Sequence, residues 1–247
     1  MKTIKPQYHV PLITLFIFIF QEFASRTGSF IANPYTYSSL DKHGVFVFIS
    51  IHHIVQALIA LLLIVILVKT RKMDFGFGLG DVSIGVRHTL VFSAIIFVYV
   101  IISYALLYIS GSDLVYNFPL NTTNILGTLG FQLLLSGTSE EILFRALPIT
   151  LLACGFKSSK YLKIHKLEIP VETIIAAVLF SIAHVSWRIN PFMINANIFQ
   201  LIISFIYGIF YGIAYQKSKS VIYPMIMHGI SNFLMVGIGY ICAFVFR

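Results

Sequence analysis

Charged residues are scarce in this chain of 247 residues, and their scarcity excludes whole classes of protein. Only 11% of the residues are charged, whereas a soluble globular domain carries about 25% charged residues. In their place 58% of the residues are hydrophobic, and the mean hydropathy is +0.90. A soluble domain is therefore excluded, and the composition predicts an all-α fold, a polytopic bundle of transmembrane helices.

Cysteine is nearly absent as well, and no segment stands apart as a cleaved secretory signal. Cys154 and Cys242 both lie in apolar stretches, so we expect small buried hydrophobes rather than a disulfide or a metal site. Residues 10–24 are apolar, but no small-residue cleavage site follows them, which indicates a first membrane span. Because the connections are short, we expect residues 1–247 to form a single integral membrane domain.

Long apolar runs dominate what is present. A transmembrane helix needs about 20 residues, and seven segments approach or exceed this length. They lie at about 10–24, 44–68, 89–109, 125–153, 171–187, 195–215 and 221–246. An eighth helix, from a division of the last segment or from residues 27–43, remains an alternative.

The positive charges are distributed unevenly between the two sides that seven spans define. One side holds Lys2, Lys5, Lys69, Arg71, Lys72, Arg87, Lys157, Lys160, Lys163, Lys166, Lys217 and Lys219. The other side holds only Arg26, Lys42, Arg188 and Arg247. The positive-inside rule then predicts a cell-membrane protein with a cytoplasmic N-terminus. The net charge of +8 indicates contact with anionic membrane lipids and gives no reason to expect nucleic acid as a partner.

Three polar clusters interrupt the apolar segments. They are Glu140-Glu141-Ile142-Leu143-Phe144-Arg145, Phe180-Ser181-Ile182-Ala183-His184, and His228-Gly229-Ile230-Ser231-Asn232. An ionisable side chain at the centre of a bilayer costs about 2.5–3.5 kcal/mol on insertion scales, so such residues usually face an internal cavity and serve a function. Together these clusters hold the groups from which a hydrolytic site can be built.

The first cluster divides into a structural pair and a free acid. Glu141 and Arg145 are four residues apart, which places them on one helix face in the favourable order, and a buried pair of this kind is expected to neutralise itself. Adjacent residues on a helix diverge by about 100°, so Glu140 points elsewhere. Glu140 is left without a counter-charge nearby in sequence, which makes it the better candidate for a general base.

The other two clusters supply imidazoles and an amide. Phe180 lies one turn before His184 and is expected to pack against its ring, while His228 and Asn232 share one helix face. Each group alone has a structural explanation, because imidazoles and amides often form hydrogen bonds between membrane helices. At 1.5 Å per residue, however, all four polar groups lie about 10–20 Å from the lysine-rich face. This shared depth favours one common site.

His52 and His53 are further ionisable groups within an apolar segment. As neighbours in sequence they point to different faces of a helix, and no Glu or Cys lies at ligand spacing. We expect them to pack rather than to bind a metal ion.

The three clusters, in this order and each on its own apolar helix, resemble the CPBP family of CAAX proteases and bacteriocin-processing enzymes, also described as Abi-type intramembrane proteases. The resemblance lies within a motif-bearing core at about 125–246, and the first 120 residues are similar only in being membranous. It implies an intramembrane endopeptidase with a CAAX-protease-like helical bundle. The substrate would be a lipidated protein cut near its C-terminus or a membrane-associated peptide, and the cavity would open toward the cytoplasm.

The resemblance also implies roles for individual residues. Glu140 and His184 would activate the attacking water, and His228 and Asn232 would stabilise the oxyanion. Zinc is an alternative, since two histidines and a glutamate can ligate it with one open position. The metal-free reaction is favoured, because the chain lacks a His-Glu-x-x-His sequence.

Two other classes of function compete with a protease. A non-catalytic membrane scaffold or a bacteriocin immunity protein would keep the motifs for structure and regulate a membrane partner. A proton-coupled transporter would also need buried acids and histidines, but the inverted repeats common in such proteins are not visible. The identity of the substrate and the oligomeric state do not follow from the sequence.

Overall fold

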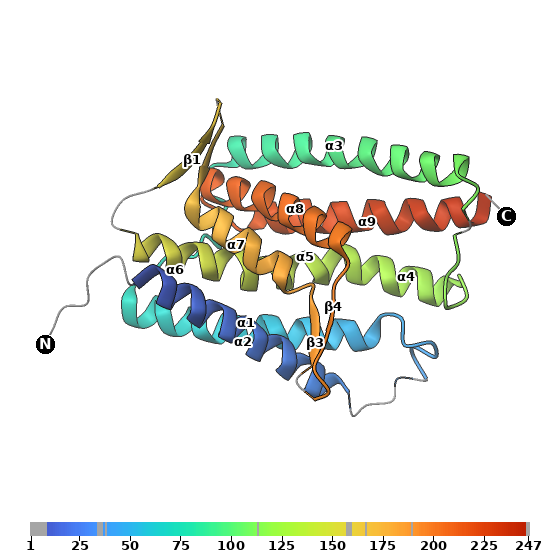
Figure 1. Cartoon of the computed structure of the whole chain (residues 1–247), viewed down its shortest axis with the longest axis horizontal. Helices are drawn as coiled ribbons and strands as arrows, with labels where there is room; N and C mark the ends of the chain where they lie inside the picture. The colour runs from blue at the N-terminus through green and yellow to red at the C-terminus, as the bar shows by residue number, and fades with distance from the viewer. Residues whose placement is uncertain are drawn as a thin grey trace, which may run out of the picture.

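The computed structural model describes residues 9–33, 37, 39–112, 114–156, 160–165, 167–188 and 190–245. Most of these residues form helices that lie roughly along the long axis of one bundle (Figure 1). Lys2, Lys5, Lys157, Lys166 and Arg247, which contribute to the charge asymmetry, lie outside the described residues. The all-helical, membranous character predicted from composition is therefore confirmed for most of the chain.

Five helices in the described part of the chain are long and apolar enough to cross a membrane. They are α1 (His9–Ala32), α2 (Val47–Arg71), α3 (Val82–Ile109), α8 (Ile198–Ser218) and α9 (Ile222–Val245). Each buries only a narrow stripe of its surface, as expected where the remaining faces contact lipid rather than water. The protein is thus a multi-pass membrane protein, but the predicted count of seven or eight spans is not confirmed.

The predicted segment at 125–153 is helical, yet it is divided. Its pieces are α4 (Thr122–Gly130), the π-helix η2 (Phe131–Ser136), α5 (Gly137–Glu141), the π-helix η3 (Ile142–Ala146) and α6 (Leu147–Gly155). A π-helical turn inserts an extra residue and rotates the side chains that follow, and such turns are frequent at functional sites. The first polar cluster lies in α5 and η3, between the two outer α-helical pieces.

The predicted segment at 171–187 is shorter than expected. Helix α7 (Val171–Ile182) contains 12 residues, which corresponds to about 18 Å and cannot cross a hydrocarbon core of about 30 Å. A hairpin of β3 (Ser186–Arg188) and β4 (Met193–Asn195) follows and leaves the bundle about midway along its length (Figure 1). The chain therefore turns back before it reaches the far end, and Arg188 lies in the hairpin that connects α7 and α8.

Small residues allow α7 and α8 to pack closely. Gly208 and Gly212 have the spacing of a GxxxG motif, and a Cβ at either position would press on Ala177 or Thr173 of α7. Small residues at such positions let membrane helices approach backbone to backbone. This contact places the C-terminal turn of α7, and the residues that follow it, beside the first half of α8.

The lysine-rich end of the bundle is closed by short, ordered connections. The loop between α2 and α3 pairs with the connection between α8 and α9 through backbone hydrogen bonds from Asp81 to Ser218 and from Val221 to Gly76. A second hairpin, β1 (Tyr161–Ile164) with β2 (Leu167–Pro170), precedes α7 at the same end (Figure 1). The exposed basic residues at this end are Lys69, Arg71, Lys72, Arg87, Lys160, Lys163, Lys217 and Lys219.

The expectation for the cysteines was wrong. Cys154 is exposed and Cys242 is half-buried, and both are free thiols. They lie in the apolar helices α6 and α9, and protein covers neither completely. An apolar environment in the sequence therefore did not imply a place inside the bundle.

Candidate active site

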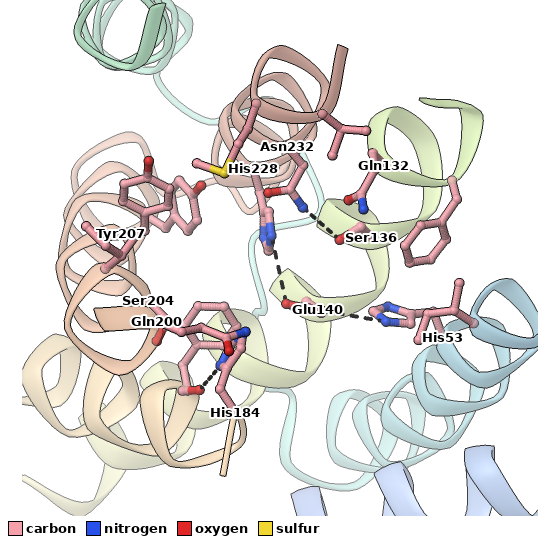
Figure 2. Close-up of a pocket in the computed structure, with 17 residues that line it drawn as sticks. His53, Gln132, Ser136, Glu140, His184, Gln200, Ser204, Tyr207, His228 and Asn232 are labelled. Atoms are coloured by element: carbon pink, nitrogen blue, oxygen red, sulfur yellow. Dashed lines mark hydrogen bonds and ion pairs between the residues drawn. The ribbon is translucent and has the colours of Figure 1, made fainter. Parts of the chain in front are cut away.

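The three polar clusters meet at one cavity inside the bundle. The cavity has a volume of about 350 Å³, and Glu140, His184, His228 and Asn232 all line it (Figure 2). Its wall comes from α2, η2, α5, α7, α8 and α9. The shared depth predicted from the sequence therefore corresponds to a real proximity of the four side chains.

Glu141 and Arg145 form the predicted ion pair. Arg145 Nη1 lies 3.1 Å from Glu141 Oε1, and both side chains are completely buried. The guanidinium also lies over the ring of Phe180, with Cζ 3.9 Å from the ring centroid. An aromatic face attracts a desolvated cation, so Phe180 and Glu141 together compensate the charge of Arg145. This pair is a structural element behind the cavity wall.

Glu141 has a second partner, which is His228. The Nδ1 atom of His228 lies 2.8 Å from Glu141 Oε1, across 87 residues of sequence. Because an ionised carboxylate can only accept, we assign the proton of this hydrogen bond to Nδ1. The imidazole is also stacked on the ring of Tyr211 at 5.1 Å and 21°. Its orientation is thus set on two sides, with Nε2 directed toward Glu140.

Glu140 lies between two imidazoles rather than alone. Its Oε1 atom is 3.6 Å from Nε2 of His53, and its Oε2 atom is 3.8 Å from Nε2 of His228 (Figure 2). The side chain is 17% exposed, in contrast to the complete burial of Glu141. The two neighbouring carboxylates therefore diverge as predicted, and the one that reaches the cavity is Glu140.

His184 lies in the turn directly after α7. Its Nδ1 atom is 2.8 Å from the carbonyl oxygen of Phe180, and its ring meets the Phe180 ring edge to face at 4.8 Å. A carbonyl only accepts, so Nδ1 carries a proton and Nε2 is an acceptor when the ring is neutral. The predicted packing of Phe180 against this imidazole is confirmed. Helix α7 ends at Ile182, and His184 reaches the cavity from the turn that follows.

Asn232 completes the polar lining from α9. One of its amide hydrogens is donated to Ser136 Oγ at 3.0 Å, which leaves the second N–H without an assigned acceptor. Asn232 is one turn beyond His228, so both side chains project from the same face of α9 toward α5 and η2 (Figure 2). Fixed donors of this kind are suited to hold a developing negative charge.

Two glycines make this close approach of α9 possible. A Cβ on Gly137 would lie 2.6 Å from the carbonyl oxygen of Met225, and a Cβ on Gly229 would lie 2.5 Å from that of Leu133. Both distances are too short for any side chain, and the opposing atoms belong to the backbone. The helices can therefore approach closely enough for His228 to reach Glu141 only because these two positions are glycine.

Comparison with known proteins agrees with this arrangement. Residues 121–234 match the family model described as Rce1-like, the type II CAAX prenyl endopeptidases. This part of the chain is similar to the CAAX protease family. The match covers just under half of the chain and includes all three polar clusters. No curated protein and no solved structure matches the chain.

His53 is the residue of the site that sequence reasoning missed. We expected His52 and His53 to pack, and the former does lie against α1, where its Nδ1 is 3.1 Å from Ser29 Oγ. His53, in contrast, lines the cavity beside Glu140. It comes from α2, outside the region that matches the CAAX protease family. Its signal was an ionisable residue in a membrane helix, which by itself indicates a functional position.

The arrangement of donors does not form a ready zinc site. Across the described ranges, no group of three or more His, Cys, Asp or Glu side chains could hold a metal ion together. The Nδ1 atom of His228 is already bonded to Glu141, and Glu140 with its two imidazole neighbours is not such a group of three. We therefore derive no step of the reaction through a metal.

The cavity extends from Glu140 away from the lysine-rich end, whereas the resemblance implies an opening toward the cytoplasm. The lining residues Ile49, Phe131 and Val236 lie on the other side of Glu140, toward the ends where α2 begins and α9 finishes. Between Glu140 and the lysine-rich end, Leu143 and Leu147 are fully buried in the apolar core. The lining of the cavity thus lies mainly in the half of the bundle opposite the lysine-rich end.

Proposed function

We propose that this protein is an intramembrane endopeptidase that hydrolyses a peptide bond near the C-terminus of a lipidated protein or in a membrane-associated peptide. One observation carries this proposal. A carboxylate, Glu140, reaches a cavity within the membrane bundle and is surrounded there by His184, His228 and Asn232. These groups are those needed to activate water and to stabilise a tetrahedral intermediate.

In the proposed reaction Glu140 and His184 act on a water molecule. The water oxygen forms a bond to the scissile carbonyl carbon while its proton passes to the Glu140 carboxylate, and the electrons of the carbonyl π bond move to oxygen. The Nε2 atom of His184 accepts a hydrogen bond from the second water hydrogen, because its Nδ1–H is held by the Phe180 carbonyl. When the C–N bond breaks, the amine takes up the proton that Glu140 carried.

His228 and Asn232 stabilise the oxyanion. Asn232 has one amide hydrogen left after its bond to Ser136, and this donor faces the cavity. His228 donates from Nε2 when that atom is protonated, and Glu141 on Nδ1 then stabilises the resulting cation. The removal of one such donor costs roughly 10²–10³ in kcat in other hydrolases.

We further propose that the reaction proceeds without a metal ion. Glu140 and His184 supply a base and an acceptor for water, and His228 and Asn232 supply two donors for the oxyanion. The roles that zinc fills elsewhere, activation of water and polarisation of a carbonyl, are thus covered by side chains. Asn232 in addition is a poor ligand for zinc but a good donor.

The lining of the cavity suits an apolar substrate. Beyond the polar groups its wall includes Ile49, Phe131, Ile203 and Met235, so side chains or a lipid group of low polarity can be bound there without the cost of leaving polar groups unpaired. Peptides or proteins within the membrane are the substrates that this lining supports best.

For orientation we propose that the lysine-rich end is cytoplasmic. Eight exposed lysines and arginines lie there among the described residues, and this asymmetry is the usual determinant of topology. The cavity then draws its substrate from the opposite half of the bilayer or through a lateral opening. This differs from a cavity open to the cytoplasm, which the family resemblance implies.

The experiment that tests the function uses purified protein in proteoliposomes. Wild type and the Glu140→Gln variant are each incubated with a lipidated C-terminal peptide and with an unlipidated apolar peptide, and products are measured by mass spectrometry. We expect cleavage by wild type alone. If membranes from cells carrying either protein show the same substrates and the same cellular phenotype, the protease proposal is wrong, and a scaffold or immunity role takes its place.

A further inference from the structure

His53 stands in direct contact with the proposed base, although it lies outside the motifs. Its Nε2 atom is 3.6 Å from Glu140 Oε1, and its Nδ1 atom is 2.7 Å from Ser139 Oγ. The side chain is 8% exposed. It contacts two consecutive residues of α5, and through them it can set the position of the Glu140 carboxylate.

We propose that His53 is a positioning residue of the active site, which shares the proton that Glu140 takes from water and so holds the protonated Glu140 carboxyl group in place. This inference rests on the proposed function. It assigns a role to α2, which contributes none of the family's polar clusters.

The hydrogen bonds of Ser139 determine which nitrogen of His53 carries the proton. Ser139 has a single hydroxyl hydrogen, and its Oγ lies 2.8 Å from the carbonyl of Leu135 and 3.1 Å from that of Ser136. Those carbonyls only accept, so we assign the hydroxyl hydrogen to one of them, and in this assignment Ser139 Oγ accepts from His53. We therefore assign a proton to Nδ1 of the imidazole.

In the neutral ring this assignment leaves a lone pair on Nε2, directed at Glu140 Oε1. No proton then lies between the two atoms while Glu140 is ionised. Once Glu140 takes a proton from water, that proton can lie on Oε1 and be donated to Nε2. The pair is thus arranged to hold a proton after the attack and not before it.

The charged and titratable neighbours of His53 agree with this arrangement. Glu140 faces it from α5, and His228 lies on the other side of the same carboxylate. His52 lies on the same helix, with its ring centroid 5.3 Å from that of His53. Its Nδ1 atom forms a hydrogen bond with Ser29 of α1 and not with a residue of the cavity. The ring is held edge-on by Phe131 at 5.0 Å and 82°, so it cannot easily swing away from Glu140.

The proton balance of the step is simple. As the water oxygen attacks the carbonyl carbon, one water proton passes to Glu140 and is shared between Oε1 and Nε2 of His53. The carbonyl oxygen becomes the oxyanion. When the C–N bond breaks, the same proton passes to the departing amine, and the carboxylate and the neutral imidazole are restored.

The test compares two substitutions that separate packing from chemistry. His53→Phe keeps a ring against Phe131 and removes both nitrogens, while His53→Gln keeps polar atoms that cannot take up a proton. His52→Gln, on the adjacent residue outside the cavity, is the control. We expect both His53 variants to lose about 100-fold in kcat, at the lower end of the range for proton transfer, with KM changed by less than about twofold. The control should match wild type.

The pH dependence of kcat gives the readout that a purely structural role would not move. Both His53 variants should show a profile different from that of wild type, because a titrating partner of Glu140 is gone. Full activity of His53→Phe would reduce His53 to a packing residue, and full activity of His53→Gln would exclude proton sharing. A loss of kcat with an unchanged pH profile would also overturn the proposal.

A spectroscopic measurement keeps the inference independent of activity. With ¹⁵N-histidine labelling, the His53 resonances are assigned by their loss in His53→Gln. We expect the proton of the neutral ring on Nδ1, and altered shifts in the Glu140→Gln variant. A proton on Nε2 in wild type would overturn the proposal. Failure of wild type to cleave any peptide would instead count against the proposed function.

Discussion

Glu141 accepts a 2.8 Å hydrogen bond from Nδ1 of His228, a residue of another helix. Glu141 also pairs with Arg145, so one buried carboxylate connects a structural cation to a histidine of the cavity. A carboxylate behind an imidazole fixes its tautomer and supports its protonated form. The acidic pair of the first cluster therefore has two functions, since Glu140 contacts the cavity and Glu141 holds the histidine that faces it.

The two glutamates should respond differently to the same substitution. Glu140→Gln should abolish cleavage with little loss of stability, because a neutral amide is cheaper to bury than a carboxylate. Glu141→Gln should lower the free energy of unfolding by about 3–5 kcal/mol, because it leaves the charge of Arg145 uncompensated. Thermal melts in detergent measure the stability of each variant, and cleavage assays on the same samples measure its activity. A stable, inactive Glu141→Gln variant beside an unstable Glu140→Gln variant would reverse the assignment.

Metal content tests the proposed metal-free reaction. Purified protein should contain well under one zinc per chain, and chelators should leave cleavage unchanged. Elemental analysis before and after chelation, with the activity followed in parallel, measures this. About one zinc per chain, lost together with activity and restored with it on addition of the metal, would contradict the proposal.

The close contact of η2 with α9 should tolerate no added side chain. A methyl group at Gly229 would meet the backbone carbonyl of Leu133, and overpacking of this kind costs about 1–3 kcal/mol. Gly229→Ala should therefore lower the melting temperature and reduce cleavage by displacing His228. Gly130→Ala is the matched control, because a Cβ there would have nothing within 4 Å. Equal melting temperatures for the two variants would show that the helices are not in such close contact.

Asp41 should stabilise the start of α2 in a pH-dependent manner. Its buried carboxylate accepts hydrogen bonds from the backbone N–H groups of Val45, Phe46 and Val47. Burial raises the pKa of Asp41, but these backbone donors outweigh burial and hold the pKa below its usual value. Loss of such a cap costs about 1–2 kcal/mol. At neutral pH, Asp41→Ala should lower the free energy of unfolding by this amount.

The sign of the pH effect follows from the lowered pKa of Asp41. A carboxylate with a depressed pKa stabilises the fold above its unfolded value, and this contribution is lost as the pH falls through the folded pKa. The difference between wild type and Asp41→Ala should therefore be largest at neutral pH and shrink below about pH 4. Asp81→Ala, at the exposed cap of α3, is the control and should have a smaller effect. A difference that stays constant down to pH 2 would contradict this assignment.

Accessibility of single cysteines tests the orientation and the opening of the cavity. In a background without Cys154 and Cys242, a cysteine at exposed Lys160 or Lys217 should be protected from an impermeant thiol reagent in intact cells. A cysteine at Val115, which is 80% exposed at the other end, should be labelled. Labelling at Lys160 or Lys217 from outside would invert the proposed topology.

Gln200, which lines the cavity, extends this test to the opening itself. A cysteine there should react from the same side as one at Val115, because the lining lies in that half of the bundle. Reaction of Gln200→Cys only after the lysine-rich face is exposed would restore a cytoplasmic opening. Unchanged cleavage by the cysteine-free background is the control for intact structure.

Composition and spacing alone were sufficient for the class of the protein and for the four motif residues that line the cavity. Uninterrupted apolar segments must form helices in a bilayer, since no other structure of a single segment satisfies its backbone there. Polar groups are so costly in these segments that Glu140, His184, His228 and Asn232 stood out. The pairing of Glu141 with Arg145 followed from helical spacing, which is a local property.

Only the tertiary structure decided what depends on contacts between segments. Residues distant in sequence are joined in the place of His53 beside Glu140, in the bond from His228 to Glu141 and in the lining of the cavity. The early end of α7 also depends on contacts between segments. The hydropathy of residues 171–187 is the same whether the chain continues as a helix or turns back at His184. Hydropathy and spacing describe one segment at a time, whereas these features result from how several helices pack around a common space.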